Sequence, residues 1–117
     1  MKLIPEWLPH AYCCVAWPCN KDLYGDFIYD AQIEIANLVN EISSDEKILL
    51  FCNSRDMFEC KKIVSNTNIY FIDVPLDDSW MRDIAPIFLR NFDQLESISF
   101  EFNGYGKYPN FSNDNKI

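Results

Sequence analysis

A stripe of apolar side chains with helical spacing, set between two short apolar runs, limits this chain to a mixed α/β fold. Residues 27–42 repeat apolar side chains with the period of a helix. Residues 11–17 and 48–52 are short apolar runs typical of buried strands. The same patterns predict a second, shorter helix and three further strands, of which the last two form a hairpin. These elements are expected at 56–64, 69–74, 86–90 and 96–102.

The two ends of the chain lack such patterns. Residues 1–10 read as an irregular opening segment held by Trp7, and residues 110–117 are polar and unpatterned, which predicts a frayed tail. The 117 residues suffice for at most one domain. Polar residues that precede the two predicted helices are the candidate N-caps, namely Asp22 or Asp26 and Asn53 or Ser54.

The charge and hydropathy of the chain exclude some classes of partner. Its 18 acidic and 10 basic residues give a net charge of −8, which argues against nucleic acid because phosphate binding needs clustered Lys and Arg. The same charge is compatible with a cationic ligand. No apolar run approaches the ~20 residues that span a bilayer. The amino-terminal residues are interrupted by Pro5 and lack a signal-peptide core, so we expect a cytoplasmic protein without membrane contact.

The five cysteines do not form a disulfide or metal pattern. Their number is odd, and the adjacent pair Cys13 and Cys14 would point to opposite faces of a strand. His10 is the only histidine, and the cysteines lack the spacing of a zinc site. We therefore expect reduced cysteines that serve as small apolar side chains, and no metal.

Residues 77–86 concentrate charge and an indole in a turn between two apolar runs. Three carboxylates, the Arg82 guanidinium and the Trp80 indole lie within ten positions. One interpretation is structural: Asp residues form turns, and Arg82 pairs with Asp78 or Asp83. The other is functional, because carboxylates beside an aromatic plane suit a flat cation such as a guanidinium. Composition alone leaves both interpretations open.

The order of residues favours the functional interpretation. The stretch Asp-Ser-Trp-Met-Arg-Asp at 78–83, followed by Pro-Ile-Phe, has three companions at 5–10, 15–18 and 102–108. These companions read Pro-Glu-Trp-Leu-Pro-His, Val-Ala-Trp-Pro and Phe-Asn-Gly-Tyr-Gly-Lys-Tyr. In type and order the four stretches resemble the agmatine deiminase and bacterial-type (Porphyromonas-type) peptidylarginine deiminase family. The resemblance implies the amino-terminal part of a pentein-type α/β propeller built from ββαβ modules, with residues 1–117 as a single incomplete domain.

The resemblance also implies a chemistry, the hydrolysis of a guanidinium. Agmatine would give N-carbamoylputrescine and ammonia, a step of putrescine biosynthesis. Carboxylates grip the guanidinium, a Cys thiolate attacks its carbon, and a His moves protons. Asp83 occupies the place of the family's first guanidinium-binding carboxylate, and Trp80 that of the indole lining the pocket. Asp78 and Arg82 are expected to support them, Asp78 as an acceptor or turn cap and Arg82 by pairing with neighbouring acids.

This sequence departs from the family pattern in ways that bear on activity. Ile84 and Ala85 replace the usual Thr-Gly, and Tyr105 replaces the usual Trp. The family's catalytic His-x-Asp and Gly-rich Cys segments have no counterpart here, so no catalytic residue is assigned among the residues present. We expect this chain alone to be inactive, as a truncated deiminase or as one part of a split enzyme.

Other functions and partners stay open at this point. A peptidylarginine deiminase and a non-catalytic binding module for guanidinium ligands are the alternatives. The expected ligand is a small cation, either agmatine or an arginine guanidinium. No cofactor is implied. Unpaired strand edges of an incomplete propeller would favour self-association or a complementing chain.

Overall fold

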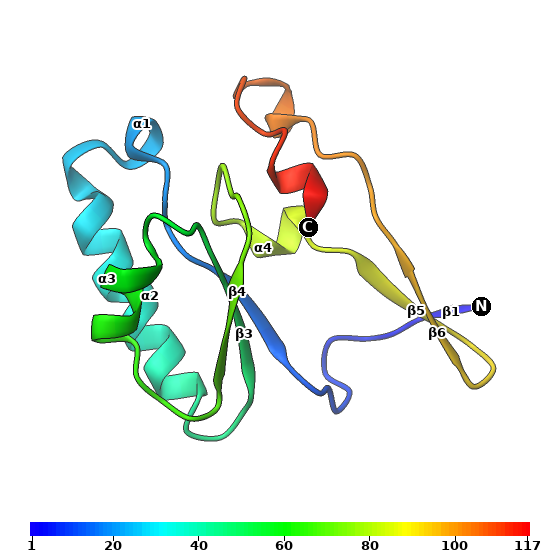
Figure 1. Ribbon diagram of the computed structural model, residues 1–117. Helices are drawn as coiled ribbons and strands as arrows, with labels where there is room; N and C mark the ends of the chain where they lie inside the picture. The colour runs from blue at the N-terminus through cyan, green and yellow to red at the C-terminus, as the bar shows by residue number, and fades with distance from the viewer.

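A computed structural model describes residues 1–117 and contains two separate three-stranded sheets joined by loops (Figure 1). The mixed α/β prediction is confirmed. The parallel sheet has the order β2-β3-β4, and the antiparallel sheet has the order β1-β5-β6. The strands are β1 (Lys2–Leu3), β2 (Cys13–Ala16), β3 (Ile48–Cys52), β4 (Ile69–Asp73), β5 (Ile87–Asn91) and β6 (Gln94–Ile98).

Two helices cover one face of the parallel sheet, and two short ones lie in its loops (Figure 1). The long helix α2 begins at Ile28, one residue later than predicted, and ends at Ile42 as the apolar period predicts. The other helices are α1 (Lys21–Tyr24), α3 (Met57–Ile63) and α4 (Met81–Ile84). Single 3-10 turns occur at Gly25–Phe27, Gly104–Gly106 and Asp114–Lys116. None of the helices has both the length and the apolar character that crossing a bilayer requires.

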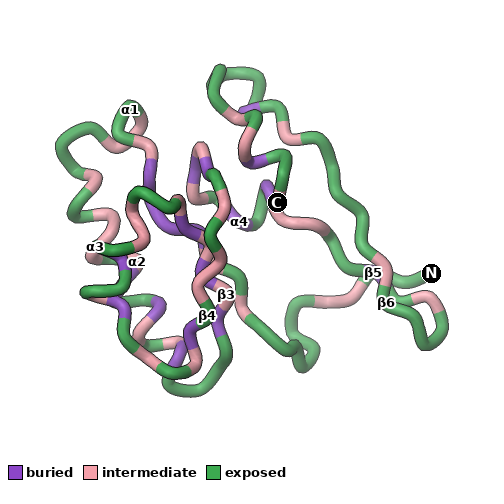
Figure 2. Tube along the Cα trace, in the orientation of Figure 1, coloured by how far each residue is buried: buried purple, intermediate pink, exposed green.

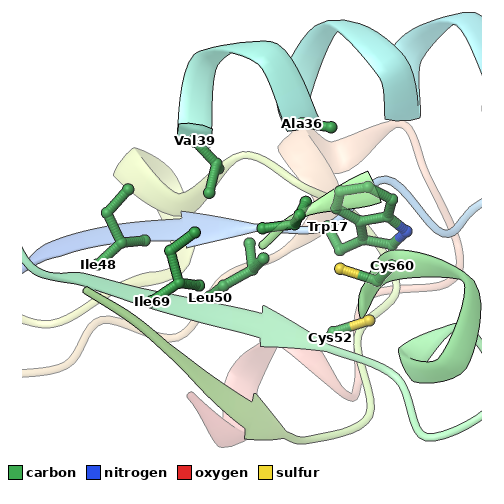
Figure 3. Packing of buried hydrophobic residues seen from close by; sticks show 9 residues of the cluster. Trp17, Ala36, Val39, Ile48, Leu50, Cys52, Cys60 and Ile69 are labelled. Atoms are coloured by element: carbon green, nitrogen blue, oxygen red, sulfur yellow. The ribbon is translucent and has the colours of Figure 1, made fainter. Parts of the chain in front are cut away.

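The main core lies between α2, α3 and the parallel sheet (Figure 3). Ile48, Leu50 and Cys52 alternate toward it from β3, and all three are fully buried. Val39 of α2 and Trp17, which follows β2, belong to the same buried cluster. Burying side chains of this size stabilises the fold by ~1.5–3 kcal/mol each. All five cysteines are free thiols, although Cys14 is exposed rather than buried.

The predicted helix caps are wrong in detail. Asn20, not an aspartate, caps the first helix: its side-chain oxygen accepts from the backbone N–H groups of Asp22 and Leu23, and α2 follows after a 3-10 turn. At the second helix, Asn53 makes its side-chain hydrogen bonds to Leu76 instead, and Ser54 donates to Asp73. Asn53 and Ser54 thus bond to residues of a distant loop and of β4 rather than to the start of α3.

Both ends of the chain differ from expectation. Trp7 is 85% exposed and does not hold the opening segment, which instead pairs through β1 with β5. Residues 110–117 do not fray, because they fold back beside α4 (Figure 1). Asp114 is 1% exposed, and Ile117 packs against the small cluster around Met81.

The antiparallel sheet projects away from the core with no helix on either face (Figure 2). The β5–β6 hairpin is confirmed, but β6 begins at Gln94, two residues earlier than predicted. Phe92 turns the chain between the strands with a φ of 54° and is 93% exposed. The exposed hairpin contrasts with the parallel sheet, whose central strand β3 is half-buried to fully buried along its length.

Candidate guanidinium site

The Asp-rich loop leaves the end of β4 and is held by a buried anchor. Met81 and Ile84, three positions apart, lie on the inner side of the single-turn helix α4. They pack into a second apolar cluster that also contains Leu76. The same turn leaves Arg82 and Asp83 exposed. Local sequence therefore fixes which side chains face solvent, although the helix itself was not predicted.

Asp83 is presented at the surface without an ion pair. Its Oδ2 accepts a hydrogen bond from the Tyr105 hydroxyl at 2.8 Å, and Oδ1 has no protein partner. Its backbone N–H donates to the carbonyl of Trp80 at 2.9 Å, so both residues belong to one turn. Trp80 is 56% exposed. The turn thus offers a carboxylate and an indole to solvent, the two groups that a flat cation needs.

Neither Asp83 nor Trp80 lines the cavity of about 680 Å³ at the carboxyl ends of the parallel strands. Cys19, Arg55 and other polar residues line that space, and the Arg55 guanidinium donates to the Cys19 carbonyl at 2.9 Å. The candidate residues Asp83 and Trp80 are therefore exposed side chains outside this cavity.

Arg82 does not pair with its neighbours, so that prediction is wrong. Its guanidinium makes a two-pronged contact with the Glu6 carboxylate, with Nη2 to Oε2 at 3.1 Å. The pairing lowers the pKa of Glu6 through the hydrogen bond and the charge of Arg82. Both side chains are about three-quarters exposed, and exposed pairs contribute little stability. The contact ties the opening segment to the loop and leaves Asp83 unneutralised.

Asp78 forms a turn cap at the start of the loop. Its Oδ1 accepts from the backbone N–H of Ser79 at 2.7 Å, and the residue is 8% exposed. Burial raises the pKa of the Asp78 carboxyl, and the nearby Asp83 charge adds to the rise. The Ser79 hydroxyl also shares a 2.6 Å hydrogen bond with Tyr24. Asp78 therefore shapes the loop and does not reach solvent as a ligand.

The carboxy-terminal segment, residues 102–117, contributes three groups that sequence reasoning missed. Asp114 Oδ1 accepts from the backbone N–H groups of Asp77 and Asp78, at 2.8 and 3.3 Å. In return, Asp77 accepts from the backbone and side-chain amides of Asn113, at 2.8 and 2.9 Å. Tyr105 holds Asp83, as described above. The consecutive Asx residues at 113–115 were the available signal, because such side chains commonly bind backbone.

Four thiols, those of Cys13, Cys14, Cys19 and Cys52, have a pKa shifted away from the range of a nucleophile. Burial raises the pKa of Cys19 to about 12 and also raises those of Cys13 and Cys14. The pKa of Cys52 is raised by its contact with Cys60 and by burial. A reactive cysteine needs the opposite shift. No group of three or more His, Cys, Asp or Glu side chains is arranged to hold a metal ion.

The only imidazole lies far from the loop in sequence and pairs elsewhere. His10 Nε2 lies 3.0 Å from Glu46, and this hydrogen bond raises the pKa of the imidazole. The group is exposed, and its hydrogen-bond partners are Leu8 and Glu46 rather than Asp83 or Trp80. The turn at 80–83 therefore presents a carboxylate and an aromatic plane, and the imidazole of His10 is paired with Glu46 instead.

The fold of this chain matches part of the pentein fold of agmatine deiminases. Solved structures share the fold: a variant of the C. jejuni agmatine deiminase with substrate bound superposes with a TM-score of 0.84 at 27% identity, over 97% of this chain and 34% of that one. The Enterococcus faecalis agmatine deiminase gives a TM-score of 0.88 at 20% identity, over 97% of this chain and 33% of that one. The pentein prediction is confirmed for the portion present.

Residues 2–117 match the family of Porphyromonas-type peptidyl-arginine deiminases, and the chain belongs to this family. A relative from Legionella pneumophila is 33% identical over 115 residues, covering 96% of this chain and 33% of its own length. The agmatine deiminase of Medicago truncatula is 28% identical over 86% of this chain and 29% of its own length. The chain thus spans about a third of the curated relatives that it matches.

Proposed function

We propose that this chain is the guanidinium-binding portion of an agmatine deiminase, which hydrolyses agmatine to N-carbamoylputrescine and ammonia. The observation that carries the proposal is the Asp83 carboxylate, which is free of any ion pair and belongs to the same anchored turn as the exposed Trp80, whose carbonyl accepts from the Asp83 backbone N–H. Membership of the deiminase family supports it. So does the similarity to the C. jejuni agmatine deiminase, whose variant was solved with substrate bound.

In this proposal Asp83 orients the guanidinium and keeps it positively charged, and Trp80 covers one face or the methylene tail. A thiolate from outside this chain attacks the guanidinium carbon, and ammonia leaves with a proton. Water then attacks the resulting thiouronium, and this releases the ureido product and restores the thiol. The raised pKa values of the cysteines in this chain support an external nucleophile. The chain alone is therefore inactive.

We further propose that the remaining two-thirds of a deiminase docks on the antiparallel sheet and supplies those groups. The register puts Leu3, Ile87 and Ile98 on one face, and Phe88 and Leu95 on the other. All five are between 41% and 67% exposed. Strands β1 and β6 are each paired on one side only. Apolar side chains on both faces of a sheet with free edges are typical of an unfinished interface.

The occupant of this sheet is tested by co-expressing the chain with the carboxy-terminal two-thirds of the Legionella pneumophila relative. Copurification of the two chains with agmatine hydrolysis is the expected result. Self-association of this chain would give a concentration-dependent mass in sedimentation and would replace the proposed partner. A monomer that ignores the second chain would refute the docking surface.

The alternative to an agmatine deiminase is a peptidylarginine deiminase, because the chain belongs to the family of Porphyromonas-type peptidyl-arginine deiminases. Asp83 and Trp80 would contact the guanidinium that both substrates share, so they do not separate the two. Turnover of agmatine against an arginine-containing peptide by the co-expressed enzyme decides between them. Binding of agmatine without turnover in that mixture favours the third hypothesis, a non-catalytic guanidinium-binding module.

The test of Asp83 itself is an agmatine titration of the full chain followed by NMR at the Trp80 indole N–H. Asp83→Asn should weaken binding by about tenfold, because it removes a charge-assisted acceptor at an exposed site. Asp93→Asn in the β5–β6 turn is the matched control, since that exposed carboxylate has no hydrogen-bond partner in the protein. Equal affinities for the wild type and the Asp83 variant would end this assignment.

A further inference from the structure

We infer that Tyr105 is the positioning residue of the guanidinium site: its hydroxyl fixes the orientation of the Asp83 carboxylate. This inference rests on the proposed function of Asp83. The hydrogen bond of 2.8 Å between the Tyr105 hydroxyl and Asp83 Oδ2 is the only hydrogen bond of the Asp83 side chain, which also has no salt bridge. Removing it would leave a surface carboxylate free to rotate.

The backbone of the 104–106 turn is built to aim this ring. Gly104, Tyr105 and Gly106 have consecutive positive φ values of 61°, 57° and 66°. Glycine adopts this conformation at little cost, whereas a tyrosine does so against a preference of ~1 kcal/mol or more. Gly104 is further required because a Cβ there would lie 2.8 Å from the ring of Phe111. A bulky residue kept in this conformation at a candidate site points to a functional constraint.

Aromatic packing then sets where the hydroxyl points. The Tyr105 ring meets Phe102 edge to face, with centroids 5.0 Å apart and an interplanar angle of 88°, and meets Tyr108 at 6.4 Å. Phe102 itself packs against the buried cluster that anchors α4 through Met81. The ring and the carboxylate are thus held by the same cluster from two directions. Their relative position is fixed although both tips are exposed.

The orientation matters because a guanidinium is planar. A carboxylate that accepts from Tyr105 on Oδ2 directs Oδ1 and the remaining lone pair on Oδ2 along one plane. A two-pronged guanidinium contact must lie in that plane. The pKa of Tyr105 is raised to about 12, by burial and by the hydrogen bond to Asp83. The Tyr105 hydroxyl therefore stays protonated near pH 7 and donates its hydrogen bond to Asp83.

The first measurement needs no ligand. Three-bond couplings to the Asp83 methylene protons should report one rotamer in the wild-type chain and averaged rotamers in Tyr105→Phe, which keeps the ring and its backbone. Tyr108→Phe is the matched control, because it removes a neighbouring hydroxyl that makes no hydrogen bond to Asp83. A single Asp83 rotamer in Tyr105→Phe would overturn the inference.

The second measurement is the agmatine titration at the Trp80 indole. Tyr105→Phe should bind about three- to fivefold more weakly than wild type, and Tyr108→Phe should be unchanged. Equal affinity of wild type and Tyr105→Phe overturns the inference while the proposed function stands. If wild type itself does not bind agmatine, the proposed function of Asp83 on this chain fails. The coupling measurement then still decides whether Tyr105 orders the carboxylate.

Discussion

Replacing Asp114 by alanine should release the Asp-rich loop from the carboxy-terminal segment. The side chain is 1% exposed and accepts from two backbone N–H groups, those of Asp77 and Asp78. Leaving one buried donor unsatisfied costs ~1–3 kcal/mol. Asp77 is only half-buried and the bond from Asp78 is long, so we take ~1 kcal/mol for each. The expected loss of unfolding free energy is about 2 kcal/mol.

Urea unfolding followed by tryptophan fluorescence measures this loss. With a denaturant slope of ~1–2 kcal/mol/M for a chain of this size, the midpoint should fall by about 1–2 M. Asp93→Ala in the exposed hairpin turn is the control, and it should leave the midpoint unchanged. An Asp114→Ala midpoint equal to wild type would show that these two hydrogen bonds do not hold the loop.

The pH dependence gives an independent check on the same residue. Burial raises the folded-state pKa of Asp114 above its ordinary value of 3.8, outweighing the two backbone hydrogen bonds that lower it. The folded state therefore binds the proton more tightly, and the resulting stabilisation is full below 3.8 and is lost as the pH rises through the raised value. Relative to Asp114→Asn, which does not titrate, wild type should gain stability between about pH 7 and pH 4. If wild type instead loses stability relative to Asp114→Asn as the pH falls, the raised pKa of Asp114 is contradicted.

Two other substitutions test the supports of the site and of the core. In urea unfolding, Gly104→Ala should lower the unfolding free energy by about 2–3 kcal/mol, because it adds a clash with Phe111 to a left-handed backbone. Gly106→Ala should lower it by only ~1 kcal/mol, because the Cβ position there is open. Leu50→Ala should cost ~2–5 kcal/mol in urea unfolding because Leu50 is fully buried in the main core, with Leu95→Ala on the exposed hairpin as the near-neutral comparison.

Elements with strong local patterns could be predicted from the sequence. The predicted strand at Ile48–Cys52 matches β3 residue for residue, because a short apolar run bounded by polar residues is typical of a buried strand. The helix ending at Ile42 followed from its apolar period. In contrast, β1 has two residues and α4 has one turn, and both depend on partners elsewhere in the chain. Segments this short carry no periodicity to read.

The position of the candidate site in the chain could be predicted, but the hydrogen-bond partners that hold it could not. The motif placed Asp83 and Trp80 together, and the structure has them on one turn. Local reasoning paired Arg82 with the nearest acids, yet its partner is Glu6, 76 positions away. Asp114 likewise reaches Asp77 across 37 positions. Charges and amides that satisfy distant backbone leave no local trace, because many Asp and Asn residues look the same in sequence.

The side chain of Asn53 completes the parallel sheet in a way that constrains what evolution or design can place there. Its Oδ1 accepts from Leu76 N–H at 2.9 Å and its Nδ2 donates to Leu76 C=O at 3.3 Å. The carboxamide thus makes the two hydrogen bonds that a backbone residue would make, one position beyond the last paired residue of β3. Aspartate lacks the donor, and glutamine is one carbon too long to make both bonds. The Asp-rich loop consequently starts from a clamped residue, and the position of Leu76 sets where the turn that contains Trp80 and Asp83 begins.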